Sequence, residues 1–239
     1  MSHSRKDTIV RQSVPNLVSH WLIALSIFSL IVSGMAQMPM AQRYKIADVP
    51  GLAWTADFHF TLSLHYLGAI ILLFAVTFHI TYALASRRFN IFPRRGDFKE
   101  SVLIIKAMLG KGEEPASHKY LAEKRLAYAF IGGSTLVVLA SGALKVAKNV
   151  AGVELSSAVI WWATLLHNVS AMLVIAGVAG HLAAFIIKEN RALLPAMFTG
   201  RVDRAYAEHR HSLWYREVVA QTVAEPIDIV ADKPGREAA

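Results

Sequence analysis

The chain has 239 residues, of which 54% are hydrophobic, and its mean hydropathy is +0.39. A soluble domain is usually about 45–50% apolar, so this composition favours a membrane protein over a soluble one. The net charge of +8 is typical of some nucleic-acid-binding proteins, but the distribution of the basic residues argues against a nucleic-acid partner. The absence of cysteine excludes disulfides, a Cys-ligated iron–sulfur cluster and covalently attached haem in this chain.

Four segments are long and apolar enough to cross a bilayer, which takes about 20 residues. They cover about residues 14–38, 62–85, 126–147 and 159–187. Backbone polar groups inside lipid must be bonded within their own segment, so these segments are predicted to be helices. Basic residues precede the first segment, as in a signal peptide, but its apolar run is too long for one, and we expect it to remain as a span. The prediction is an all-α integral membrane protein, a bundle of four transmembrane helices, with no internal repeat evident in the sequence.

Lys and Arg are divided unequally between the two sides of these spans. Of the 25, 3 precede the first span, 10 lie between the second and third, and 8 follow the fourth, which leaves 4 on the other side. The positive-inside rule then places both termini and the 86–125 loop in the cytoplasm. That loop contains an amphipathic helix around Phe98–Leu109, expected on the membrane surface or against a partner. Residues 1–217 are predicted to form the membrane domain and 218–239 a flexible tail.

Five of the ten histidines lie within or at the edge of the spans: His20, His65, His79, His167 and His181. Ionisable residues inside a membrane are rare and usually functional. His167 and His181 are fourteen positions apart, close to four whole turns, so they share one helix face and are separated by roughly 21 Å along the axis. This arrangement favours two haems stacked across the bilayer, each taking one imidazole from this helix and one from a neighbour.

The partners of these two histidines must match them in depth. His65 lies near the outer start of the second span and can face His167, whereas His20 lies near the inner start of the first span and can face His181. His79, fourteen positions after His65, has the same inner depth, so depth alone does not choose between His20 and His79. The alternatives are that such histidines only hydrogen-bond neighbouring helices, or that they relay protons in a haem-free transporter.

Five stretches of the chain carry a family resemblance. They are VSHWLIALSIFSLIVSG (18–34), SLHYLGAIILLF (63–74), KYLAEKRLAYAF (119–130), LLHNVSAMLVIAGVAGH (165–181) and GRVDRAYAEHRHSLWYRE (200–217). Over about residues 10–217 the chain resembles the gamma subunit, the cytochrome b membrane anchor, of respiratory formate dehydrogenases. The resemblance implies two haems b, the outer ligated by His65 and His167 and the inner by His20 and His181. His79 is then a supporting histidine, or the alternative inner ligand.

The resemblance also implies a quinone pocket beside the inner haem, at the start of the third span. The family usually reads KYNAGQK there, whereas this chain reads KYLAEKR, so Leu121 replaces the Asn that would bond a quinone carbonyl. The implied quinone contacts are Tyr120, Glu123, Lys124 and His181, with Glu123 as a candidate proton donor. The alternative is that Glu123 and Lys124 only cap the third helix.

The family implies an electron-transfer subunit with no catalytic residues of its own, anchored in the bacterial inner membrane. A periplasmic iron–sulfur subunit, docked on the outer loops 39–61 and 147–158, would receive electrons from a catalytic subunit containing molybdenum or tungsten. This chain would pass them through the two haems to quinone. The alternatives are the cytochrome b anchor of a hydrogenase or of another molybdopterin oxidoreductase and, in another class, the proton-coupled transporter.

Overall fold

The computed structural model describes residues 8–87, 89–108, 110–113 and 115–224. Four long helices dominate this part of the chain, and each is long and apolar enough to cross a membrane. They are α1 (Val14–Ala36), α3 (Phe58–Ala85), α5 (Ala122–Ala147) and α6 (Ser157–Ala183), the last extended to Ile186 by the 3₁₀ turn η4 (Ala184–Ile186). The prediction of four long apolar helices, each able to cross a membrane, is confirmed.

Polar residues fix where two of these helices begin. The Asp57 carboxylate accepts a hydrogen bond from the Phe60 backbone N–H at 3.0 Å, and the Ser156 hydroxyl accepts one from Val159 at 3.4 Å. Such N-caps satisfy backbone donors that have no partner in the first turn. Hydropathy detects only the apolar part of a helix, so α3 and α5 begin at residues 58 and 122, before the predicted 62 and 126.

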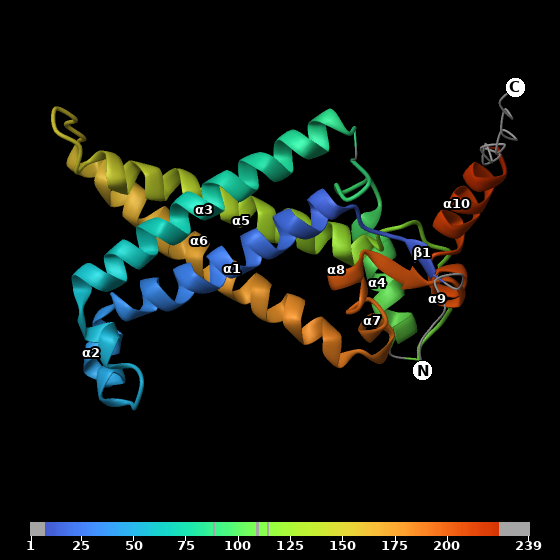
Figure 1. Ribbon diagram of the computed structural model, residues 1–239, viewed down its shortest axis with the longest axis horizontal. Coiled ribbons are helices and arrows are strands. Elements are labelled where there is room, and N and C mark those ends of the chain that lie inside the picture. The colour runs from blue at the N-terminus through green and yellow to red at the C-terminus, as the bar shows by residue number, and fades with distance from the viewer. Residues whose placement is uncertain (1–7, 88, 109, 114, 225–239) are drawn as a thin grey trace, which may run out of the picture.

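The long helices form two hairpins that cross each other. Helix α1 packs along α3 and α5 along α6, and the hairpins cross near their middles (Figure 1). A small cluster of Ile27, Leu72 and Val174 joins α1, α3 and α6 at that level. Large apolar side chains elsewhere point outward, for example Ile70 and Phe74, which are 66% and 63% exposed. An apolar exterior over a small core is what lipid contact requires.

The two ends of the bundle carry different segments (Figure 1). The far end holds the α5–α6 connection and three short helices: α2 (Pro39–Arg43), η2 (Ile46–Asp48) and η3 (Ala53–Ala56). The terminal end holds the following elements: β1 (Thr8–Val10), α4 (Asp97–Met108), α7 (Lys188–Arg191), α8 (Ala196–Thr199), β2 (Arg201–Asp203), α9 (Arg204–Arg210) and α10 (Ser212–Ala224). Both predicted cytoplasmic segments, the loop after α3 and the region after α6, therefore share one end.

Two sequence predictions concern segments of the terminal end. The helix expected around Phe98–Leu109 is present as α4, although residue 109 itself lies outside the described residues. Helix α10 runs to Ala224, beyond the predicted domain boundary at 217. The remainder of the predicted flexible tail, 225–239, lies outside the described residues.

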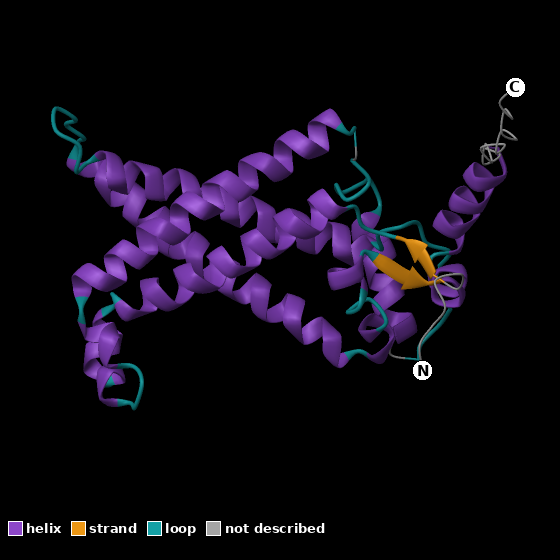
Figure 2. Ribbon diagram, viewed as in Figure 1, coloured by secondary structure: helices purple, strands orange, loops and turns teal. Residues whose placement is uncertain are grey.

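The all-α prediction is wrong in one place, because β1 and β2 form a two-stranded antiparallel sheet (Figure 2). Ile9 lies opposite Val202 in the register. Strands of three residues carry too little alternation to be recognised, and these two partners come from opposite ends of the sequence. Gly200, at φ +71°, turns the chain into β2, and its carbonyl accepts hydrogen bonds from the Arg11 and Gln12 N–H groups. The fold is therefore mostly helical.

The sheet, α9 and α10 form a small domain that we call the cap. Val202, Ala207 and Trp214 are its buried apolar core. Arg11 is only 3% exposed and lies over the Trp214 ring, 5.2 Å from the ring centroid. The cap thus ties the N-terminal strand to the C-terminal helices beside the membrane domain.

His211 is fully buried in the cap. Its Nδ1 lies 2.8 Å from the His118 carbonyl oxygen, which can only accept, so Nδ1 carries the proton. Burial lowers the pKa of His211 to about 3, and the Arg11 guanidinium acts in the same direction. The imidazole is therefore neutral and joins the cap to the segment before α5.

Candidate functional site

The two histidines of the predicted outer pair lie together at the far end of the bundle, and we call them the far pair. His65 on α3 and His167 on α6 have ring centroids 6.4 Å apart with planes inclined by 64°. Both side chains are half-buried. The matching depth expected from the sequence therefore corresponds to a direct juxtaposition.

Hydrogen bonds hold both far-pair rings in one tautomer. The Ser33 hydroxyl donates to the Ser29 carbonyl at 2.7 Å, so its oxygen is left to accept from His65 Nδ1, 3.0 Å away. His167 Nδ1 lies 3.1 Å from the Val138 carbonyl, which can only accept. Each Nδ1 therefore carries the proton and each Nε2 keeps its lone pair. A neutral imidazole oriented in this way is what a metal ligand needs.

Glycines allow the helices to approach both far-pair rings. A Cβ at Gly34 would lie 3.3 Å from His65 Cε1, and one at Gly142 would lie 3.2 Å from His167 Cε1. Each glycine directly follows a serine, Ser33 or Ser141, whose oxygen lies 3.0 or 3.4 Å from Nδ1 of the same histidine. The two rings are thus supported by equivalent Ser-Gly pairs from α1 and α5.

His20 and His181, the predicted inner pair, lie together toward the terminal end, and we call them the terminal pair. Their ring centroids are also 6.4 Å apart, with planes inclined by 61°. His20 comes from α1 and His181 from α6, so α6 contributes to both pairs. Trp21 and Phe185 meet these two rings edge-on, with centroid distances of 5.6 and 6.1 Å.

His79 has other partners. Its Nε2 lies 3.0 Å from the Tyr128 hydroxyl on α5, and its Nδ1 lies 3.4 Å from the Ser19 hydroxyl on α1. The two ring nitrogens are both hydrogen-bonded, whereas His20 faces His181 directly. The geometry therefore favours His20 over His79 as the partner of His181.

The two hairpins are equivalent, which corrects the expectation that the chain has no internal repeat. Where a residue of α1 is buried, the residue 108 positions later in α5 is often buried too. The same holds for α3 and α6 with an offset of 102 positions. The equivalent buried pairs are Ser26 and Ser134, Ile27 and Thr135, Ser33 and Ser141, Thr61 and Ala163, Gly68 and Ser170, and Leu72 and Val174. Few of these pairs are identical residues, so the repeat is expressed in packing more than in sequence.

The equivalence places the far pair on the two-fold axis that relates the hairpins. His65 and His167 occupy corresponding positions, as do His79 and His181. His20 in α1 corresponds to Tyr128 in α5, 108 positions later. The terminal end therefore has two equivalent places, one formed by His20 and His181 and the other by Tyr128 and His79.

Three of the four residues implied as quinone contacts lie at or just before the start of α5, and the fourth, His181, lies on α6. The Tyr120 hydroxyl lies 3.2 Å from Gln12 Nε2, which donates to it. Glu123 and Lys124 are half-buried in the first turn of α5. Leu121, which replaces the family's Asn, is fully buried against Ile104 of α4. That position belongs to the core in this protein.

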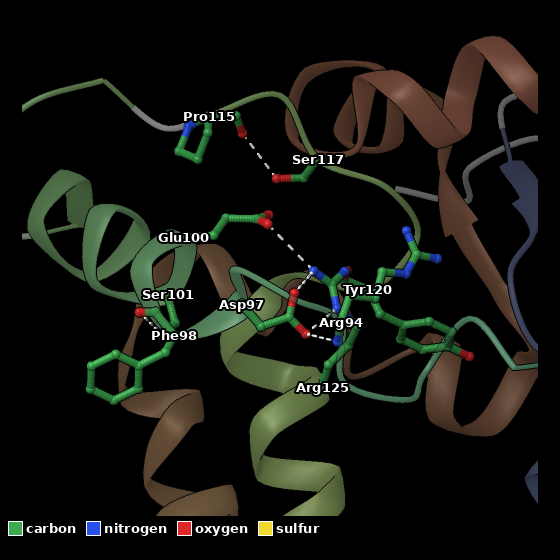
Figure 3. Close-up of polar contacts among 9 residues, drawn as sticks. All are labelled: Arg94, Asp97, Phe98, Glu100, Ser101, Pro115, Ser117, Tyr120 and Arg125. Atoms are coloured by element: carbon green, nitrogen blue, oxygen red, sulfur yellow. Dashed lines mark hydrogen bonds and ion pairs between the residues drawn. The ribbon is translucent and has the colours of Figure 1, made fainter.

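A buried ion pair fixes this start of α5 to α4 (Figure 3). Arg125 donates from Nε and Nη2 to the two oxygens of Asp97 at 2.8 and 2.6 Å, and its Nη1 donates to the Tyr120 carbonyl at 2.5 Å. Glu100 lies farther from Nη2, at 3.4 Å. These bonds from Arg125 hold the pKa of Asp97 below its ordinary value. Helix α4 therefore packs against the protein itself and positions the segment that leads into the membrane.

The histidine pairs fit a haem iron with two axial imidazoles. A metal-bound imidazole nitrogen lies about 2.0–2.1 Å from the metal in zinc sites, so two imidazoles on one ion have ring centroids roughly 6 Å apart. Both observed separations, 6.4 Å, agree with that value. The far pair also has the required tautomer, and a chain without cysteine can hold haem only non-covalently.

Comparison with known proteins gives the class. Residues 11–200 match the profile of the family described as prokaryotic cytochrome b561, and the chain belongs to that family. Membership in this family of b-type cytochromes implies haem b.

Individual named proteins are similar to this chain over most of its length. The chain is 23% identical over 239 residues to the formate dehydrogenase cytochrome b556 subunit of Haemophilus influenzae, covering 98% of this chain and 92% of that protein. It is 26% identical over 217 residues to the cytochrome b556(fdo) subunit of formate dehydrogenase from Escherichia coli K12, covering 90% and 95%. The nitrate-inducible cytochrome b556(Fdn) subunit of the same organism is 23% identical over 221 residues. The resemblance to the gamma subunit family is confirmed.

Sequence reasoning missed the groups that surround the histidines. Ser33-Gly34 and Ser141-Gly142 could have been found, because the same dipeptide occurs in both apolar segments at the spacing of the repeat. Tyr128 could not, because a single tyrosine in an apolar helix carries no pattern.

Proposed function

We propose that this chain is the dihaem cytochrome b subunit of a membrane-bound complex of the formate dehydrogenase type. His65 and His167 would ligate one haem, and His20 and His181 the other. The observation that carries the proposal is the pair of equal 6.4 Å imidazole separations at different depths along α6. When bound, haem b supplies reversible one-electron transfer at its iron.

The orientation of the chain follows from its charges. The terminal end carries most of the basic residues, so we assign it to the cytoplasm and the far end to the periplasm of the bacterial inner membrane. The far pair then lies next to the far-end loops, 39–61 and 147–158, where an iron–sulfur subunit would dock and deliver electrons from a molybdenum- or tungsten-containing subunit. The terminal pair lies toward the side where quinone takes up protons.

The chain's own residues hold this route in place. Ser33, Ser141 and the Val138 carbonyl orient the far-pair imidazoles, and the small residues beside them let the helices come close. The two pairs lie at different depths, so an electron moved between them crosses part of the membrane potential, and a full crossing costs about 2.3 kcal/mol per charge per 100 mV. At the terminal end, Tyr120, Glu123, Lys124 and His181 are the quinone contacts that the family implies.

Formate-driven haem reduction tests the proposal. Membranes that contain the chain with its partner subunits should show the absorption band of reduced b-type haem after formate addition, and added quinone should reoxidise it. A His167→Ala variant should abolish formate-driven reduction and leave one haem that dithionite still reduces. Reduction by hydrogen instead of formate would identify the chain as a hydrogenase anchor. The absence of haem would favour the proton-coupled transporter.

A further inference from the structure

We propose that the His79–Tyr128 pair binds a quinone head group, with the Tyr128 hydroxyl as its hydrogen-bond donor. The inference rests on the proposed function and deepens it, because it assigns quinone recognition to residues other than those implied by the family. Three observations support it: the position of the pair, its hydrogen bonds and the aromatic rings beside it.

The position follows from the repeat. Tyr128 and His79 occupy the place equivalent to His20 and His181, so the two pairs lie at the same depth on opposite sides of the axis. Ser19, which precedes His20 in α1, lies 3.4 Å from His79 Nδ1 and connects the two places. An electron acceptor at Tyr128 would therefore be next to the terminal pair and level with it.

The hydrogen bonds provide a donor that can turn to a carbonyl. The Ser19 hydroxyl donates to the Asn16 carbonyl at 3.1 Å, so it accepts from His79 Nδ1, and His79 Nε2 then accepts from the Tyr128 hydroxyl at 3.0 Å. Rotation about the phenolic C–O bond turns the Tyr128 hydrogen away from His79 Nε2 and toward a bound carbonyl, and no proton leaves its atom. This change needs no net charge in the apolar interior, where charge is costly.

Aromatic rings flank the pair on the terminal side. Phe92 meets the Tyr128 ring edge-on, with centroids 5.7 Å apart at 80°, and Phe89 packs on Phe92 at 6.0 Å. Phe89 and Phe92 are 47% and 44% exposed. These partly exposed rings place apolar surface beside a polar pair, which suits an aromatic ring that carries carbonyl groups.

The position used by the family is closed in this chain. Leu121 is fully buried against α4 and has no group that could bond a carbonyl. Tyr128 lies seven residues later, about two turns along the same face of α5. A donor at Tyr128 would therefore lie about two turns farther along α5 than the family's Asn.

The test compares quinone binding in three tyrosine variants of the full-length haem-loaded chain in lipid nanodiscs. Tyr128→Phe removes the proposed donor and keeps the ring. Tyr82→Phe removes a hydroxyl that bonds Ser13 at the same end, and Tyr120→Phe removes one implied by the family. The probes are menadione and decylubiquinone, titrated calorimetrically with empty nanodiscs subtracted, and haem per chain is measured in each sample.

We expect Tyr128→Phe to weaken binding of the better probe by about tenfold, the equivalent of one lost hydrogen bond. Tyr82→Phe should bind within about twofold of the wild type, Tyr120→Phe should lose less affinity than Tyr128→Phe, and all four proteins should hold two haems. Unchanged binding in Tyr128→Phe, or a loss confined to Tyr120→Phe, would overturn the site while two haems per chain leave the proposed function intact. Wild-type protein that binds neither probe would also overturn it, and wild-type protein without haem would refute the proposed function itself.

Discussion

The two ends of the bundle use the same helix hairpin differently. At the far end the hairpins are nearly equivalent, and one histidine from each meets its counterpart on the axis, supported by the same Ser-Gly pair. At the terminal end the equivalence is broken, because His20 faces His181 whereas Tyr128 bonds His79. A repeated hairpin can thus provide one shared site on its axis and two different sites away from it.

Their surroundings differ as well. Short loops and one-turn helices cover the far end, whereas the terminal end is fastened by the cap, by α4 and by the buried Asp97–Arg125 pair (Figures 1 and 3). The end that we assign to quinone exchange is therefore the one with the more extensive polar framework.

The largest expected effect is the loss of one haem from the terminal end when His20, but not His79, is replaced. His20→Ala should remove one of two haems, because His181 then has no imidazole opposite it. His79→Ala should keep both, because His79 bonds Tyr128 and Ser19. Haem per chain measured by pyridine haemochrome distinguishes them. Loss of a haem in His79→Ala with retention in His20→Ala would reverse the assignment.

Asp97→Asn is expected to weaken the terminal end alone. It leaves the Arg125 charge buried without its carboxylate, which costs about 3–5 kcal/mol, whereas Glu100→Gln, whose side chain is 35% exposed, should cost about 1 kcal/mol or less. Thermal unfolding followed by circular dichroism measures both. Equal losses of stability in the two variants would show that the buried Asp97–Arg125 pair stabilises the fold no more than the Glu100 contact does.

The pH dependence of this ion pair has a defined sign. Because the pKa of Asp97 is lowered in the fold, its contribution to stability is complete above the ordinary Asp pKa of about 3.9 and is lost as the pH falls through the lowered value. The pair should therefore stabilise α4 equally between about pH 5 and pH 8.

Gly34→Ala and Gly142→Ala test the equivalence of the hairpins at the far end. A methyl group in either place presses on its histidine ring, so each should weaken haem binding there by about tenfold, and by similar amounts. Ala140→Val, at an exposed position of α5, is the control and should have no effect. The rate of haem loss to apomyoglobin is the measurement. A large difference between the two glycine variants would refute the equivalence.

The smallest effects should show where that equivalence ends. Ser33→Ala removes an acceptor 3.0 Å from His65 Nδ1, whereas Ser141→Ala leaves His167 Nδ1 bonded to the Val138 carbonyl. Loss of an acceptor makes an imidazole a poorer electron donor, so the far haem should have a higher reduction potential in Ser33→Ala, by the equivalent of about 1 kcal/mol. Ser141→Ala should shift it less. Potentiometric titration provides both values, and the reverse order would contradict this account.

The sequence was most informative where a physical constraint repeats along the chain. Apolar length predicted all four helices. The fourteen-residue spacing placed His167 and His181 on one helix face, and matching depth predicted that His65 can face His167. Depth alone did not distinguish His20 from His79 as the partner of His181. Packing decides which face of a helix meets which neighbour, and the sequence does not show packing. The Ser19 and Tyr128 contacts of His79 depend on that packing.

Long-range polar contacts could not be predicted. The β1–β2 sheet pairs short strands from the two ends of the sequence, and Asp97 meets Arg125 across a 28-residue separation. None of these segments carries a periodic pattern that identifies its partner. The burial of Leu121 could not be predicted for the same reason, because it depends on the packing of α4 against the start of α5.

The most direct test of the account is the dithionite-reduced minus oxidised optical spectrum of the purified chain, with haem quantified per polypeptide. Two matched imidazole pairs predict two b-type haems per chain. A value of one would show that one pair does not bind haem. Well-folded protein without haem, produced with adequate haem supply, would contradict the electron-transfer function.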